Sequence, residues 1–251
     1  MGAFYGVFFD LGSTLLYFDG DWEDVFTRSD QAVSAALSEA GCKLDSLDFP
    51  TLFRQRLRAY HASRDQDLIE HTTEKILTDL LAELGLPEIS DEVLNSAMTR
   101  MYAVSQADWH AEADALKTLK ELNQLGYKIG VISNAANHQD VSTLIDQAGF
   151  RPELDFILTS AKNGMRKPSP TIFQEALDNW NVGPSQVLMV GDLLRPDIFG
   201  AKQLGIYSVW ITRRAKNQEN ARYAGQITPD ATISALSELP ELIRQLEAGN
   251  P

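Results

Sequence analysis

Short apolar runs that each end at a glycine or a polar residue recur along this chain, and they constrain its fold more than any other feature. They are rich in β-branched and aromatic residues, as expected for strands buried on both faces. Helical patterns lie between them over residues 138–148, 170–180 and 196–204. This alternation predicts a Rossmann-like α/β fold, a parallel sheet covered by helices on both faces. The predicted strands are residues 5–9, 128–132, 186–190 and 207–211.

The stretch from residue 19 to residue 110 interrupts this alternation, because it contains several helical patterns and no convincing strand. Apolar residues recur at helical spacing around residues 22–37, 76–84 and 90–101. An all-helical insert directly after the first strand is expected to lie over the carboxyl ends of the strands, where open α/β sheets bind ligands. We therefore predict a catalytic core of residues 1–18 and 111–251, a helical cap subdomain of residues 19–110, and hinge strands near 15–20 and 108–114.

The composition limits the classes of function. With 22 basic and 35 acidic residues, the chain has a formal net charge of −13 at pH 7, which argues against a nucleic-acid-binding surface. No apolar stretch approaches the ~18 residues of a membrane span, and the apolar start lacks the basic residues of a signal peptide. Cys42 is the single cysteine, which excludes an internal disulfide. We expect a cytoplasmic monomer or homodimer with no nucleic-acid or membrane partner.

Polar groups that follow the predicted strands are expected to meet at one edge of the sheet. Asp10 follows the first strand and Asp192 the third, so two carboxylates would lie close together, which is unfavourable unless a cation lies between them. Mg²⁺ fits because a hard divalent ion prefers oxygen ligands, and we predict that Asp10, Asp192 and the backbone carbonyl of Gly12 bind it. Asp197 is either a further ligand or an acid that caps the following helix.

Four short segments carry the polar residues of this edge: Asp10-Leu11-Gly12-Ser13-Thr14, Ser133-Asn134, Arg166-Lys167-Pro168, and Gly191-Asp192 with Asp197. Their order and spacing resemble the haloacid dehalogenase-like hydrolase superfamily, in the subgroup with a helical cap after the first motif. The resemblance covers residues 4–211. It implies a Mg²⁺-dependent phosphatase that acts on a small phosphorylated metabolite, in which Asp10 attacks phosphorus and forms an aspartyl-phosphate that water then cleaves.

The resemblance also implies roles for the other segments. The Ser133 hydroxyl would hydrogen-bond a phosphoryl oxygen, with Asn134 placed to assist. Lys167 would neutralise the charge of the phosphoryl group and the aspartates, and Arg166 is able to share that role. Arg195, in the loop after the third predicted strand, is a further candidate for substrate contact. We therefore expect Ser133 and Lys167 to act with the nucleophile in catalysis and all five residues to bind substrate.

The chain departs from the family pattern at Gly12. Family phosphatases usually carry a second aspartate there, which protonates the leaving group and is worth ~10²–10⁴ in rate. Haloacid dehalogenases proper carry tyrosine at this position and need no metal. Phosphonate-cleaving relatives use a cap lysine as a Schiff base, for which Lys43 and Lys75 are the only candidates. A dehalogenase or phosphonatase, and a non-catalytic regulatory protein that binds metal and phosphate, are therefore the alternatives.

Other conspicuous side chains have simpler explanations. Arg54, Arg58 and Arg64 are able to reach an anionic substrate from the cap, but on a helix such residues are more often a solvated face. The tryptophans lie among apolar neighbours and are predicted to belong to the core. They are Trp22, Trp109, Trp180 and Trp210.

Overall fold

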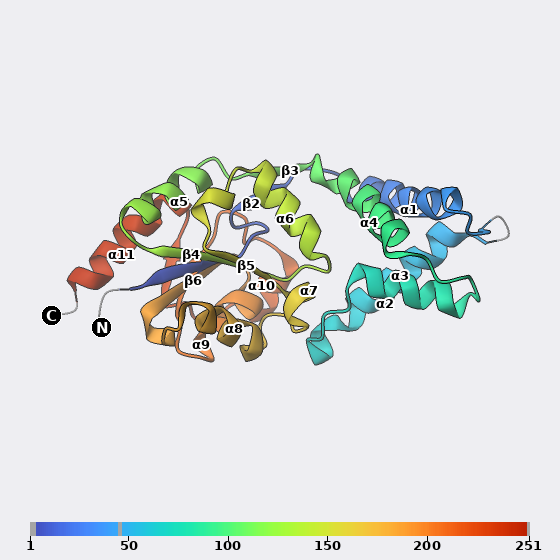
Figure 1. Ribbon diagram of the computed structural model, residues 1–251. Coiled ribbons are helices and arrows are strands. Elements are labelled where there is room, and N and C mark those ends of the chain that lie inside the picture. Colours follow the sequence, from blue (N-terminus) through green and yellow to red (C-terminus); the bar gives the residue numbers. More distant parts are fainter. Residues whose placement is uncertain (1–3, 45–46, 250–251) are drawn as a thin grey trace.

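The computed structural model describes residues 4–44 and 47–249. Its centre is a six-stranded parallel sheet, which confirms the predicted fold class (Figure 1). All four predicted strands are present, with ends that differ from the prediction by no more than one residue. The sheet has the strand order β5 (Phe156–Thr159), β4 (Lys128–Ser133), β1 (Gly6–Phe9), β6 (Val187–Gly191), β7 (Tyr207–Ile211) and β8 (Ala231–Ile233).

The alternation of side chains along β1 explains the two layers of helices that cover the sheet. Val7 and Phe9 belong to a core on one face, whereas Phe8 belongs to a second core on the opposite face. The first core is completed by α5 (Ala115–Gln124), α6 (His138–Gln147) and α11 (Leu239–Ala248). The second is completed by α8 (Pro170–Trp180) and α9 (Gly200–Lys202). Figure 1 shows these layers above and below the sheet.

Four helices follow β1 and lie to one side of the sheet (Figure 1). Their buried apolar residues form a third cluster, separate from the two clusters of the sheet. A two-stranded antiparallel ladder of β2 (Leu16–Phe18) and β3 (Trp109–Ala111) lies where the hinge strands were expected. The helices are α1 (Trp22–Glu39), α2 (Phe49–Asp67), α3 (Thr73–Glu83) and α4 (Asp91–Gln106), and we call the segment from α1 to α4 the helical insert.

The helix predicted over 196–204 is only partly correct. A π-helix runs over Leu194–Phe199 and is followed by the short α9. Its wide turn places Asp197 under the end of β6, close to Gly191. A side chain at Gly191 would overlap the Asp197 carboxyl group, so the missing Cβ is what allows this approach.

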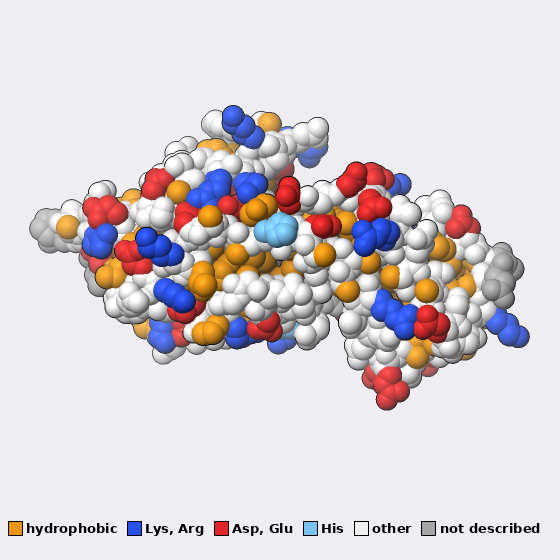
Figure 2. All heavy atoms as spheres, turned by 90° about the horizontal axis from the view of Figure 1, so that it is seen from above, with side chains coloured by type: hydrophobic (Ala, Val, Ile, Leu, Met, Phe, Trp, Pro, Cys, Tyr) orange, Lys and Arg blue, Asp and Glu red, His pale blue; other side chains and the backbone are white. Residues whose placement is uncertain are grey.

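Two further features of the described residues concern apolar helices and surface charge. Within residues 4–44 and 47–249, no helix combines the length and apolar character that crossing a membrane requires. On the face shown in Figure 2, basic and acidic side chains of the described residues are intermixed, and a narrow waist separates the sheet from the helical insert.

Candidate active site

The carboxyl ends of the three central strands bring the predicted residues together. Asp10 follows β1, Ser133 ends β4 and Asp192 follows β6, and β1 lies between the other two strands. The Asp10 amide donates to the carbonyl of Val190, 2.9 Å away, which fixes Asp10 at the end of the sheet. Beside these strand ends lies a cavity of about 260 Å³, lined among others by Asp10, Gly12, Ser133, Lys167 and Asp197.

Lys167 is the centre of the polar network at this edge. Its buried ammonium donates to Asp10 Oδ1, Asp197 Oδ1 and the Ile132 carbonyl, each at 2.7 Å. Burial opposes the positive charge, but the two carboxylates outweigh it and raise the pKa of Lys167. Lys167 is therefore charged and held against the carboxylate of the predicted nucleophile.

The three aspartates form a group that could hold a metal ion. One carboxylate oxygen each of Asp10, Asp192 and Asp197 lies within 4.8 Å of the others. Burial and then the charges of Asp10 and Asp197 raise the pKa of Asp192 to about 9. Burial raises the pKa of Asp197 to about 6, although Lys167 opposes this shift. Three carboxylates lie near a single ammonium group, so the site has an excess of negative charge. Carboxylate oxygens are ligands that a hard divalent cation prefers, which supports the predicted chemistry of the site.

Neighbouring groups fix the two aspartates that follow β6. The Asp192 carbonyl accepts hydrogen bonds from Trp210 Nε1 at 2.9 Å and Asn220 Nδ2 at 2.8 Å. Asp197 Oδ2 accepts from the Leu193 amide at 3.0 Å. Asp197 thus lies inside the π-helix and holds the backbone amide of Leu193 before it, while its other oxygen accepts a hydrogen bond from Lys167.

The segment Ser133-Asn134 contributes a hydroxyl group to the cavity and an amide group that positions Lys167. The Ser133 hydroxyl lines the cavity and has no hydrogen-bond partner among the described residues. Asn134 instead holds the backbone of Lys167: its Oδ1 accepts from the Lys167 amide at 2.7 Å, and its Nδ2 donates to the Lys167 carbonyl at 2.9 Å. The structure thus gives Asn134 a positioning contact that the sequence does not predict.

The two predicted arginines lie in different surroundings. Arg166 lines the cavity, but it is buried and forms an ion pair with Glu70 of the helical insert. Arg195 does not line the Asp10 cavity. It lines a neighbouring hollow with Asp65 and Glu219, two residues that also line the Asp10 cavity. A substrate contact of Arg195 stays a prediction.

Arg64, near the end of α2, lines the cavity, although its helical position predicts a solvated side chain. Its half-buried guanidinium has no hydrogen bond or ion pair to a described residue. Burial and then the nearby charge of Arg166 lower its pKa. Asp65 and Glu219 line the same wall. An unpaired guanidinium at a cavity wall is available to an anionic ligand, so the solvated-face interpretation does not describe Arg64 fully.

Of the four tryptophans, Trp22 differs from its core prediction. Trp109, in β3, packs against the first core and also lines the cavity beside Gly12. A Cβ at Gly12 would lie 3.4 Å from the Trp109 ring, which is an ordinary contact. Trp22 is 43% exposed and stacks on Phe18. Both belong to the boundary between the sheet and the helical insert, where apolar sequence neighbours do not imply burial.

Asp140 in α6 gives a pH-dependent prediction. Burial raises its pKa from 3.8 to about 6, although a hydrogen bond from Gln106 opposes the shift. The folded-state pKa of Asp140 lies above its unfolded value. The contribution of Asp140 to stability is therefore complete below about pH 4 and is lost as the pH rises through 6. We expect Asp140→Asn to raise the free energy of unfolding by at most about 3 kcal/mol at pH 8 and not at pH 4.

Urea unfolding at the two pH values measures this difference. Asp146→Asn is the matched control, because Asp146 is an exposed carboxylate of the same helix whose pKa Arg151 lowers through a hydrogen bond. The control is expected to give no gain at pH 8. An equal gain in both variants, or a gain for Asp140→Asn at pH 4, would contradict the assignment.

The comparisons with known proteins agree with this geometry. Residues 6–205 match the model of the haloacid dehalogenase-like hydrolases, so the chain belongs to this family and is a hydrolase. A glyceraldehyde 3-phosphate phosphatase of Methanocaldococcus jannaschii is 26% identical over 243 residues, which cover 96% of this chain and 98% of that protein. The pyrimidine 5'-nucleotidase YjjG of Escherichia coli is 26% identical over 227 residues, covering 88% of this chain and 98% of the relative.

A solved structure of a relative has the same architecture. The 2-haloacid dehalogenase from Pseudomonas syringae has a TM-score of 0.67 and 26% sequence identity, covering 98% of this chain and 100% of that chain. Relatives named for phosphate ester cleavage and for dehalogenation therefore share this fold, and the site must decide between the two chemistries.

Proposed function

We propose that the protein is a Mg²⁺-dependent phosphatase that acts on a small phosphorylated metabolite through an aspartyl-phosphate intermediate. The observation that carries this proposal is the group of a partly buried Asp10 and the buried Asp192 and Asp197, with Lys167 as its only cationic hydrogen-bond partner among the described residues. Dehalogenation needs no metal, whereas a divalent cation bound by these carboxylates would balance the negative charge of a phosphoryl dianion during its transfer.

In this mechanism an Asp10 carboxylate oxygen attacks phosphorus, and the bond from phosphorus to the ester oxygen breaks. The ester oxygen leaves with the bonding electron pair and takes a proton from water, because Gly12 supplies none. Mg²⁺ held by Asp10, Asp192, Asp197 and the Gly12 carbonyl would supply positive charge against the phosphoryl oxygens. The Lys167 ammonium balances the negative charge of the Asp10 carboxylate, and the free Ser133 hydroxyl donates to a phosphoryl oxygen. Water then attacks phosphorus, which releases phosphate and restores the Asp10 carboxylate.

The helical insert has the place of a cap subdomain in this proposal, with residues 19–110 over a core of residues 1–18 and 111–251. Arg64 comes from this insert and lines the cavity that contains Asp10. A closed insert would exclude water and bring Arg64 to the anionic substrate. The cytoplasmic location and the monomeric or homodimeric state stay predictions.

The alternatives have less support from the site. Lys75, one of the two lysines of the insert considered for a Schiff base, is exposed and paired with Asp79, and neither Lys75 nor Lys43 lines the Asp10 cavity. A phosphonatase of that type is therefore disfavoured. Gly12 is the residue that keeps a non-catalytic metal- and phosphate-binding protein as an alternative, whereas a dehalogenase proper would carry tyrosine at this position.

The test is release of phosphate from a panel of phosphomonoesters and of halide from 2-haloacids, each in Mg²⁺ and in EDTA. The proposal predicts phosphate release in Mg²⁺ that disappears in EDTA. Halide release in EDTA would identify a dehalogenase instead. Binding of Mg²⁺ and inorganic phosphate without any product would identify the regulatory alternative.

Gly12→Asp tests the effect of the missing general acid. The cavity beside Gly12 accepts a Cβ without a short contact, so an aspartate is expected to fit. We expect it to raise kcat at least about tenfold for an alkyl phosphate, whose leaving group needs a proton, and to change kcat little for an activated aryl phosphate. Gly12→Asn is the matched control and should give no such difference. A loss of rate on both esters would show that the site has its own proton donor.

A further inference from the structure

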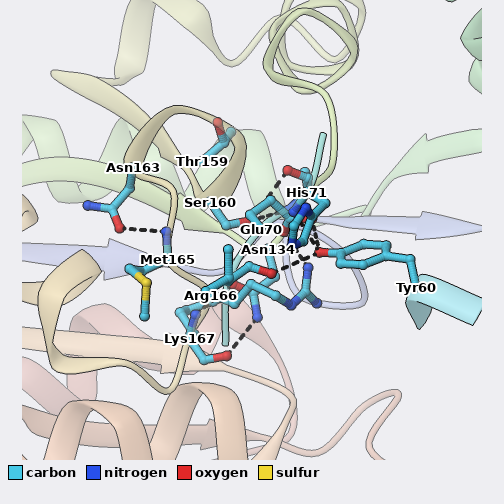
Figure 3. A network of polar contacts seen from close by, with 12 residues as sticks. Tyr60, Glu70, His71, Asn134, Thr159, Ser160, Asn163, Met165, Arg166 and Lys167 are labelled. Carbon is cyan, nitrogen blue, oxygen red and sulfur yellow. Dashed lines mark hydrogen bonds and ion pairs between the residues drawn. The ribbon is translucent and has the colours of Figure 1, made fainter. Parts of the chain in front are cut away.

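Glu70, in the loop between α2 and α3, is a buried carboxylate with three side-chain donors. Tyr60 Oη donates to Glu70 Oε1 at 2.6 Å, while Ser160 Oγ and Arg166 Nη1 both donate to Oε2. Figure 3 shows Tyr60, Ser160 and Arg166 converging on Glu70. Tyr60 belongs to the helical insert, whereas Ser160 and Arg166 belong to the part of the chain that follows β5. Glu70 therefore joins the two parts through buried polar contacts.

Backbone pairing reinforces this junction. The Glu70 amide donates to the Gly164 carbonyl at 2.9 Å, and the Arg166 amide donates to the Leu68 carbonyl at 2.8 Å. Ile69 and Met165 form an antiparallel bridge between these two bonds. Residues 68–70 and 164–166 thus form a short antiparallel pairing, which we call the insert–core seam.

The seam ends one residue before the lysine that contacts the nucleophile. Asn134 fixes the Lys167 backbone from one side, and the seam fixes the preceding residue from the other. The Lys167 ammonium has three partners at 2.7 Å, so a shift of its backbone would disturb all three contacts. The position of the catalytic cation therefore depends on a residue of the insert.

The charge of Glu70 is what makes this dependence strong. Arg166 is buried, Glu70 is its ion-pair partner, and its Nε has no partner among the described groups. Removing one member of a buried ion pair leaves an uncompensated charge, which is strongly destabilising. The guanidinium of Arg64 adds further positive charge nearby. Without the Glu70 carboxylate, Arg166 is expected to move toward solvent and displace the segment that carries Lys167.

We infer that Glu70 is a positioning residue for Lys167, and that the insert–core seam makes the placement of the catalytic cation depend on the contact between the helical insert and the core. The inference rests on the proposed function in one respect, because it assigns the kinetic consequence to Lys167 at Asp10. Its structural part concerns the order of residues 164–167 and is measurable without turnover.

The test is Glu70→Gln, which keeps the size of the side chain and removes its charge. We expect kcat to fall about 10–100-fold with less than about a threefold change in KM, because misplaced catalytic groups slow the reacting step. We also expect faster amide hydrogen exchange at Arg166, since its bond to Leu68 belongs to the seam. Glu70→Asp keeps the charge and should restore part of kcat, and it is the variant to use if Glu70→Gln does not fold.

Glu74→Gln is the matched control. Glu74 lies one helical turn farther along, in α3, and also contacts the core, through Asn137, but it is not part of the seam. Its kcat is expected to stay within about twofold of the parent. A double variant with Arg166→Gln should be no slower than the slower single variant, because the two side chains act as one unit.

Two results would overturn the inference. One is a folded Glu70→Gln protein with unchanged exchange at Arg166. The other is a loss of kcat no larger than that of Glu74→Gln. Failure of the proposed function is recognised separately, because the parent protein would then release no phosphate, while the exchange measurement would still decide whether Glu70 orders residues 164–167.

Discussion

Asp10→Asn is expected to abolish phosphate release, with a fall in kcat of at least about 10³-fold. The amide has nearly the shape of the carboxylate but carries no charge, so it cannot attack phosphorus and no longer pairs with Lys167. Phosphate release from the best ester of the panel, at saturating Mg²⁺, measures the loss. The melting temperature and far-UV spectrum of the variant establish that it is folded.

Asp19→Asn is the control for this substitution. Asp19 is an exposed carboxylate that follows β2 and is not among the residues that line the cavity. Its kcat should match that of the parent. Residual activity of Asp10→Asn above about one tenth of the parent rate would show that another group attacks phosphorus.

Lys167→Met has the second large expected effect, on both stability and rate. Methionine fills a similar volume but leaves Asp10, Asp197 and the Ile132 carbonyl without their common donor. Removing one partner of a buried ion pair costs about 3–5 kcal/mol, so we expect a decrease of that size in the free energy of unfolding. We also expect kcat to fall at least about 10²-fold, because the phosphoryl charge loses a fixed cation.

Urea unfolding in EDTA and phosphate release in Mg²⁺ measure the two effects. Lys162→Met, at an exposed position of the short α7 (Ser160–Asn163), is the control and should change neither quantity. A Lys167→Met protein as stable as the parent would contradict the assigned network. A normal kcat in that protein would remove Lys167 from the mechanism.

The sequence predicts the part of the site that is built by local order. Each of three apolar runs ends beside a polar residue of the candidate site. Asp10, Ser133 and Asp192 are therefore expected at the strand ends, and the structure places them there. The strands β5 and β8 are not predicted. Only the last two of the four residues of β5 are buried, and β8 has three residues, which is too short for a recognisable pattern. Helix α2 is not predicted from periodicity either, since only Phe49, Phe53 and Leu57 are buried along its length.

The contacts that the sequence does not predict are long-range. Glu70 and Arg166 are 96 positions apart, and nothing in the local pattern of either residue indicates the other. The same holds for Arg64, which resembles a solvated helix residue until the insert is placed beside the strand ends. Arg195 is close to Asp192 in sequence, but it lines a neighbouring hollow and not the Asp10 cavity. Tertiary packing, not propensity, decides all three positions.

The central claim is that Asp10 becomes phosphorylated during turnover. The most direct measurement is an acid-quenched reaction of the parent protein with a phosphate-labelled ester in Mg²⁺, followed by mapping of the labelled peptide. We expect a base-labile label on the peptide that contains Asp10, absent in Asp10→Asn and in EDTA. Release of labelled phosphate at the full rate with label on another residue, or with none on the Asp10 peptide at any quench time, would contradict it.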